Sequence, residues 1–300
     1  MRKERERKLV KGRHVANKKL VYTIYFTLRV LVVVMMVAQF FNGNFENVLL
    51  CVLTLVLFLL PSVLERSLHI DLPDTLEIVI LLFIFAAEIL GEIQSFYITF
   101  PYWDTMLHTL NGFLCAAIGF ALVDLLNRNE RVSLNLSPFF MAVVAFCFSM
   151  TIGVIWEFFE FSMDQIFLMD MQKDTILNTI STVNLDPDHG TKAIIIRGIQ
   201  DVILVLEDGT QMPLGLGGYL DVGIADTMED LFVNFVGAVV FSAIGFIYVK
   251  TRGKSRIAPQ FIPQVLDLPE ETGGEAAPSA AGEAPGSGED GGNGIEKLGE

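Results

Sequence analysis

The sequence predicts an all-α membrane protein, a bundle of six transmembrane helices with both termini in the cytoplasm and a small extracytoplasmic insertion that contains β-strands. Three observations lead to this fold class. The 300 residues are 52% hydrophobic and only 19% charged, and their mean hydropathy of +0.51 is too high for an ordinary soluble domain. Six apolar segments are each long enough to cross a hydrocarbon core, which takes roughly 20 helical residues. Basic residues gather at alternate segment ends, as the two sides of a membrane require.

Each apolar segment is expected to be a helix, because a helix satisfies its backbone hydrogen bonds internally inside lipid. A basic stretch before an apolar run also describes a signal peptide, but the first run has no small-residue cleavage site, so an uncleaved span is predicted. In chain order, the spans are expected at about 20–41, 47–64, 76–97, 103–126, 138–168 and 224–249.

Lysine and arginine near span ends favour the cytoplasmic side and therefore predict the topology. Residues 1–19 form a basic segment with a net charge of +7, and the loops at 42–46 and 98–102 contain no basic residue. The remaining basic residues of the same side are Arg66, Arg128, Arg131, Lys250, Arg252, Lys254 and Arg256. Both termini are expected in the cytoplasm, and the protein is expected in the plasma membrane.

Two segments are expected to lie outside the bundle. The loop at 170–222 holds eight acidic residues, which suits an extracytoplasmic insertion. Apolar, β-branched stretches at 193–196 and 202–206, followed by Asp208-Gly209, predict short strands and a hairpin turn. The acidic tail at 266–300 is rich in Gly, Ala, Pro and Glu, a composition that predicts disorder.

The composition also limits the partners. A net charge of −14 excludes a basic chain that wraps nucleic acid, and three cysteines are too few for a disulfide-stapled secreted domain. The lipid bilayer is the partner that the apolar spans imply, and nothing in the sequence identifies a protein partner.

Polar side chains inside four of the spans are the main functional signal, since ionisable groups in a transmembrane helix are costly. Their spacings of three, four, seven or eight residues place each set on one helical face. The predicted direction of each span brings every set into the outer half of the bundle. The residues are Glu88 and Glu92 in the third span, Asp104, His108 and Asn111 in the fourth, Glu157 and Glu160 in the fifth, and Asp226, Asp230 and Asn234 in the sixth.

The residue types suggest a site for one or two divalent metal ions, because carboxylates and imidazole are their common ligands. We predict as metal ligands Asp104, His108, Glu157 and Asp230. Glu160 or Asp226 is the predicted general base on a metal-bound water. Glu88, Glu92, Asn111 and Asn234 are further polar candidates. The alternative for each set is structural, since polar side chains also hydrogen-bond helices together in membranes.

At these residues the sequence resembles the YjdF-like family of multi-spanning membrane proteins, a family without an established activity. The resemblance rests on four local segments within residues 80–245, and it implies that their polar residues belong to one site. The loop from Asp170 to Tyr219 looks like an insertion relative to the family. The matching segments are EILG at 88–91, WDTMLH at 103–108 with Gly112, WEFFE at 156–160, and DTMED at 226–230 continuing through Asn234 to Gly237.

Three functions fit the sequence. The first is a metal-dependent enzyme acting on a lipid headgroup or a lipid-linked substrate. The second is a cation or proton-coupled transporter, in which the carboxylates bind and release the ion. The third is a non-catalytic membrane scaffold or sensor, with the insertion and the acidic tail as contact surfaces.

Overall fold

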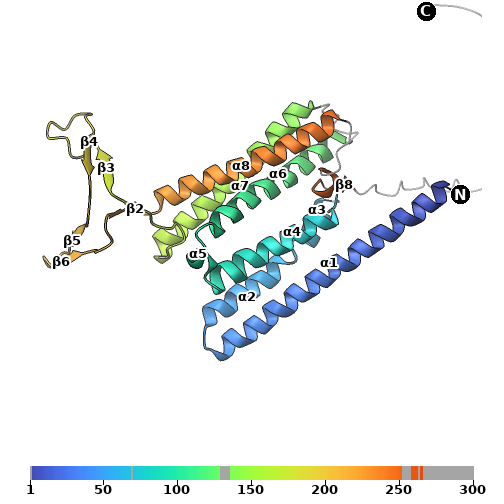
Figure 1. Ribbon diagram of the computed structural model, residues 1–300, viewed down its shortest axis with the longest axis horizontal. Helices are drawn as coiled ribbons and strands as arrows, with labels where there is room; N and C mark the ends of the chain where they lie inside the picture. Colours follow the sequence, from blue (N-terminus) through green and yellow to red (C-terminus); the bar gives the residue numbers. More distant parts are fainter. Residues whose placement is uncertain (1, 69, 129–135, 252–257, 263, 266–300) are drawn as a thin grey trace, which may run out of the picture. The chain divides into compact units, whose positions relative to one another are not determined.

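The computed structural model describes residues 2–68, 70–128, 136–251, 258–262 and 264–265, and the chain is mostly helical (Figure 1). The predicted disordered tail at 266–300 and four of the basic residues, Arg131, Arg252, Lys254 and Arg256, lie outside these ranges. The longer helices are α1 (Arg2–Phe41), α2 (Phe45–Leu57), α3 (Leu60–Leu68), α4 (Asp74–Phe85), the π-helix η1 (Ala86–Ile93), α6 (Trp103–Arg128), α7 (Pro138–Phe167) and α8 (Ile224–Lys250). Two short ones, α5 (Phe96–Thr99) and the 3₁₀-helix η3 (Ala258–Gln260), complete the helical elements.

Five helical stretches are long and apolar enough to cross a membrane. They agree with five of the six expected spans and run over Lys18–Phe41, Phe45–Ser67, Trp103–Asp124, Pro138–Phe167 and Ile224–Lys250. The remaining expected span, at 76–97, is divided between α4 and the π-helix η1. Helix η1 ends at Ile93, and Ser95 shortly after it has a left-handed backbone conformation (φ 55°). The number of crossings and the side of each terminus therefore stay predictions.

Two helix boundaries differ from the expected spans for local reasons. The helical stretch at 45–67 breaks between α2 and α3, because Pro61 has no backbone N–H and its ring would clash with the carbonyl of Leu57. Helix α1 begins at Arg2, so the basic segment and the first apolar span form one helix of 40 residues, about 60 Å long.

Helices α6, α7 and α8 pack side by side and form the part of the bundle that carries the polar residues (Figure 1). Glycines allow the closest approach: a Cβ on Gly112 would collide with the backbone of Asn234, and one on Gly237 with the backbone of Thr109. The Ser149 hydroxyl of α7 donates to the Gly112 carbonyl at 2.7 Å. Deeper along the helices, a buried apolar cluster continues the packing with Ala116, Ala117, Phe120, Met141, Ala145, Ala238 and Phe241.

A second apolar cluster joins α1, α2 and α4 and reaches α6 through Leu114. Its most deeply buried members are Val32, Cys51, Phe58, Leu76 and Leu81. Strand β1 (Ile70–Asp71), which follows α3, pairs with β8 (Gln264–Val265), so the segment beyond α8 is tied to the loop before α4.

The predicted β-containing insertion is confirmed between α7 and α8, where three antiparallel strand pairs occur. The turn at Asp208-Gly209 also forms: Gly209 adopts φ +81°, and the Thr210 amide donates to Asp208 Oδ1 at 2.8 Å, which lowers the pKa of this exposed carboxyl. The pairs are β2 (Ile176–Leu177) with β7 (Tyr219–Leu220), β3 (Thr179–Thr182) with β4 (Ile194–Arg197), and β5 (Ile203–Val205) with β6 (Gln211–Pro213).

Candidate metal centre

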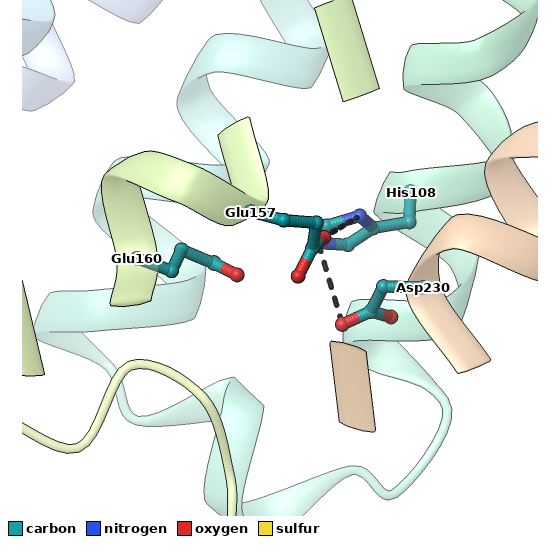
Figure 2. A group of neighbouring side chains, drawn as sticks. All are labelled: His108, Glu157, Glu160 and Asp230. Carbon is teal, nitrogen blue, oxygen red and sulfur yellow. Dashed lines mark ion pairs between the residues drawn. The ribbon is translucent and has the colours of Figure 1, made fainter. Parts of the chain in front are cut away.

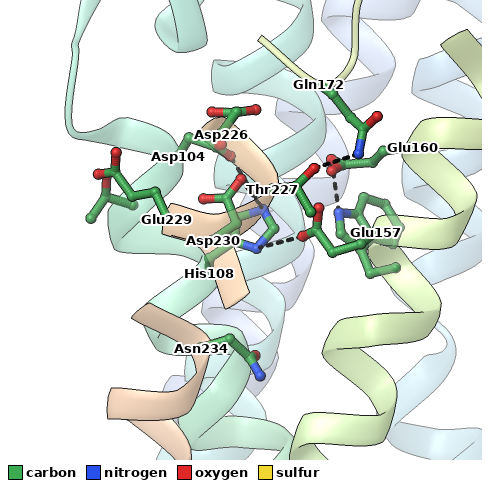
Figure 3. Close-up of polar contacts among 12 residues, drawn as sticks. Asp104, His108, Glu157, Glu160, Gln172, Asp226, Thr227, Glu229, Asp230 and Asn234 are labelled. Atoms are coloured by element: carbon green, nitrogen blue, oxygen red, sulfur yellow. Dashed lines mark hydrogen bonds and ion pairs between the residues drawn. The ribbon is translucent and has the colours of Figure 1, made fainter. Parts of the chain in front are cut away.

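The polar residues of α6, α7 and α8 meet at one end of the three helices (Figure 3). Asp104 and Asp226 lie in the first turns of α6 and α8, and His108 and Asp230 follow one turn later. Helix α7 runs in the opposite direction, so its late residues lie beside the early residues of its two neighbours. The predicted one-sided spacing of each helix therefore produces a shared cluster.

The inner group consists of His108, Glu157, Glu160 and Asp230, four buried residues whose ligand atoms all lie within 4.8 Å of one another (Figure 2). The imidazole lies between two carboxylates: Nδ1 is 3.8 Å from Glu157 Oε1, and Nε2 is 3.8 Å from Asp230 Oδ2. These separations are too long for hydrogen bonds. They fall within the range expected for two ligands of one divalent ion, since metal–ligand distances of about 2.0 to 2.6 Å put ligand atoms roughly 3 to 5 Å apart.

Three carboxylate oxygens of the inner group have no hydrogen-bond partner among the described residues. Glu157 Oε2, Glu160 Oε2 and Asp230 Oδ2 are each buried and accept no hydrogen bond. An uncompensated buried carboxylate costs several kcal/mol, and neighbouring carboxylates repel one another in addition. Their chemistry and spacing therefore fit a bound divalent cation, which would satisfy all three oxygens at once.

The outer group consists of Asp104, Asp226 and Asp230, whose ligand oxygens again lie within 4.8 Å of one another. Asp104 and Asp226 are only half-buried, and Asp104 Oδ1 is 3.5 Å from Nε2 of His108. Asp230 belongs to both groups, so the two groups are adjacent and have this one residue in common (Figure 3).

Residues around the cluster hold its members in place. The Trp156 indole donates to Glu160 Oε1 at 2.9 Å, so one oxygen of Glu160 is fixed while the other stays free. The Lys173 backbone amide donates to Asp226 Oδ2 at 2.7 Å. Gln172 donates to the Thr227 hydroxyl at 2.5 Å. Trp156 lies four residues before Glu160 and so shares its helical face, and Thr227 lies within the DTMED segment. Nothing in the sequence singles out Gln172.

The loop that follows α7 is fastened to the helix ends by two aspartates. Asp164 Oδ1 and Oδ2 accept the backbone amides of Met171 and Gln172, so this carboxylate holds the loop to the end of α7. Asp221 Oδ1 accepts the amide of Thr175, and its Oδ2 accepts the amide of Ala225 in the first turn of α8. These bonds keep the strand-containing insertion attached beside the cluster.

The remaining predicted candidates lie apart from the two groups. Glu88 is half-buried and Glu92 is exposed on η1, and neither belongs to either group of described ligands. Asn111 and Asn234 hydrogen-bond to each other at 3.4 Å, one turn beyond Asp230. The grouping also differs in detail from the predicted ligand set, since Glu160 lies with His108 whereas Asp104 lies with Asp226.

An apolar groove of about 470 Å³ lies along α6 and α8, and none of the carboxylates of the two groups line it. Its lining includes Thr105, the residue after Asp104. The Thr105 hydroxyl donates to Glu229 Oε1 at 3.4 Å. The other lining residues are Tyr102, Met106, Thr109, Leu110, Phe113, Gly237 and Val240. The groove thus reaches the level of the outer group and continues along the apolar part of the helices.

Comparisons with known proteins agree with the membrane fold. A protein of Thermotoga maritima described as "Uncharacterized protein" is 26% identical over 106 residues, 35% of this chain and 53% of that protein, so the chain spans about half the length of the curated relative it matches. No solved structure matches. The family model described as "Predicted membrane protein (DUF2238)" matches residues 23–251, which include all three helices of the cluster. The chain therefore belongs to the DUF2238 family of predicted integral membrane proteins.

Proposed function

We propose that this protein is a membrane-embedded, metal-dependent enzyme acting on a lipid headgroup or a lipid-linked substrate. The observation that carries the proposal is the set of three orphaned, buried carboxylate oxygens around His108. A structural cluster would use such oxygens to hydrogen-bond the helices together, but these oxygens make no such bond in the described chain.

The inner group offers a division of roles. Catalytic metal sites commonly use three protein ligands and leave one position open. His108, Glu157 and Asp230 supply one ligand from each helix, and the pair of imidazole and carboxylates suits Zn²⁺, Mn²⁺ or Fe²⁺. When bound, such an ion would lower the pKa of a coordinated water towards neutrality. Glu160, with one oxygen held by Trp156 and the other free, is the proposed general base for that water.

The surroundings favour an amphiphilic substrate. The apolar groove beside the cluster can hold an alkyl chain, and its lining at Thr105 would bring the attached headgroup to the level of Asp104. Lys173, whose backbone amide contacts Asp226 and whose ammonium lies beside Asp170, places a cation at this end of the helices, which suits a phosphate-bearing headgroup. Helices α6 and α8 also begin at this level, and the partial positive charge of a helix N-terminus favours a negatively charged group.

Ion transport is the second candidate, because polar groups continue along α8 beyond the cluster. Asn234 is buried one turn below Asp230, and Ser242, two turns further, has a buried hydroxyl without a hydrogen-bond partner among the described residues. If wild-type protein carries divalent cations into proteoliposomes and Asn234→Leu does not, ion transport would be favoured over catalysis.

The test combines metal analysis with an activity assay. Purified wild-type protein should contain stoichiometric metal by mass spectrometry, and His108→Ala should lose it. Glu160→Gln should keep the metal yet fail to release phosphate from vesicles that contain phosphatidic acid. Glu46→Gln, an exposed acid at the start of α2 and away from the cluster, should match wild type in both. Wild-type protein that stays metal-free after incubation with Zn²⁺ and Mn²⁺ would refute the proposal.

A further inference from the structure

We propose that the centre holds two divalent cations, with the Asp230 carboxylate bridging them. The inner cation is the one described above, and the outer one is bound by Asp104, Asp226 and Asp230. This inference rests on the proposed function and extends it to the outer group.

Asp230 has the position and the unbonded carboxylate oxygen that a bridging ligand needs. Its ligand oxygens lie within 4.8 Å of both groups, its side chain is only 3% exposed, and its Oδ2 accepts no hydrogen bond. A carboxylate has two oxygens with about four acceptor sites, so it can serve two cations at once. Paired catalytic metals typically lie about 3.5 to 4 Å apart, a distance that one carboxylate spans.

The charge of the cluster also calls for more than one cation. Five carboxylates belong to the two groups together, so a single divalent ion leaves three negative charges and a second ion leaves one. The ammonium of Lys173 lies 3.6 Å from Asp170 Oδ2, outside both groups. Low-dielectric surroundings strengthen the remaining repulsion between carboxylates and thus favour the second ion.

The two positions differ in exposure, which predicts different affinities. Every ligand of the inner cation is buried, whereas Asp104 and Asp226 are half-buried and face the end of the helices. The Lys173 amide occupies Asp226 Oδ2 and leaves Oδ1 to bind the ion. The outer cation should therefore bind more weakly and exchange faster than the inner one.

Manganese provides a probe that reports number and proximity together. Detergent-purified full-length protein, stripped with EDTA and titrated with Mn²⁺ alone, should bind two equivalents and give the spin-coupled electron paramagnetic resonance spectrum of a close pair. Asp226→Asn and Asp104→Asn should each bind one equivalent with the six-line spectrum of an isolated ion. Glu229→Gln is the control: Glu229 is next to Asp230 in the sequence but belongs to neither group, so this variant should keep two coupled ions.

Each other result has a defined meaning. One equivalent in wild type, unchanged in Asp226→Asn and Asp104→Asn, would overturn the two-cation centre and leave the single-metal enzyme standing. Two equivalents that survive both substitutions would also overturn it, since the second ion would then lie elsewhere. No bound Mn²⁺ or Zn²⁺ in wild type would refute the proposed function itself. Circular dichroism and a melting curve for each variant confirm that it is folded, and the two independent outer variants keep the test decisive if one of them unfolds.

Discussion

A single glutamate illustrates how side chains are prepared for function within this bundle. Glu160 is 7% exposed, its Oε1 accepts the indole N–H of Trp156, and its Oε2 has no partner in the described chain. The indole therefore fixes the orientation of the carboxylate without neutralising it. Such supporting hydrogen bonds decide how well a reactive group is positioned.

Replacement of Trp156 with Phe should destabilise the protein through Glu160. Loss of the donor leaves both carboxylate oxygens without a partner, and the free energy of unfolding should fall by about 1 to 3 kcal/mol. Melting in detergent measures the effect, and a double-mutant cycle with Glu160→Gln should show coupling between the two residues. Trp103→Phe is the matched control, since its indole donates to the Ala86 carbonyl outside the cluster. Additive effects of the two substitutions would contradict the coupling.

The sequence predicted the residues of the cluster better than it predicted their grouping. Regular spacing on a helix, such as Asp226 to Asp230, determines which side chains share a face, and this part needs no tertiary information. The division into an inner and an outer group depends on the rotation of each helix about its axis. That rotation is set by contacts between distant residues, such as Gly237 against Thr109, which no local pattern reveals. The roles of these residues as ligands or base stay predictions.

The crossing of α6 and α8 is the element on which the geometry of the cluster depends. Gly112 and Gly237 let the two backbones touch, one turn or two beyond His108 and Asp230. Small residues have this role throughout membrane proteins, where lipid provides no hydrophobic force between helices. The distance between His108 on α6 and Asp230 on α8 is therefore set by glycines that lie outside the cluster.

A methyl group at Gly237 should separate the two helices. Its Cβ would meet the backbone of Thr109 and Phe113, which cannot rotate away, so Gly237→Ala should lower stability by about 1 to 3 kcal/mol and weaken Mn²⁺ binding. Gly245→Ala on the same helix is the control, because its Cβ would meet only the Phe120 side chain. Melting curves and Mn²⁺ titrations report the two effects. Equal Mn²⁺ affinity in both variants would contradict the link between this crossing and the cluster.

Elements with a purely local signal were predicted well, and those that depend on distant partners were not. The long apolar helices and the Asp208-Gly209 turn follow from composition and turn chemistry. The change from the α-helix α4 to the π-helix η1 has no sequence signature of its own. The pairing of β2 with β7 joins segments on either side of the whole insertion, so only the folded chain shows it.

At the scale of the whole molecule, the topology makes the most direct prediction. If six spans cross the membrane with both termini inside, exposed positions should alternate between the two sides. The test uses a background in which Cys51, Cys115 and Cys147 are replaced. In it, the single substitutions Asn44→Cys, Tyr102→Cys and Asp208→Cys should each react with an impermeant maleimide in intact cells. Ser67→Cys and Thr251→Cys should react only after the cells are permeabilised. Labelling of positions 67 and 102 from the same side would show that α4 and η1 do not cross.

The order in which the chain is made adds a consequence of the three-helix cluster. His108 and Glu157 emerge from the ribosome before the long strand-containing insertion, and Asp230 emerges after it. Chains are synthesised from the N-terminus, at about 5 to 20 residues per second, so the last ligand arrives seconds after the first. Loading of the proposed metal would then wait until α8 is inserted, and a chain that stops short of α8 would lack the Asp230 ligand. An ion held by all three helices would mark a finished chain, because it would stabilise only the completed bundle.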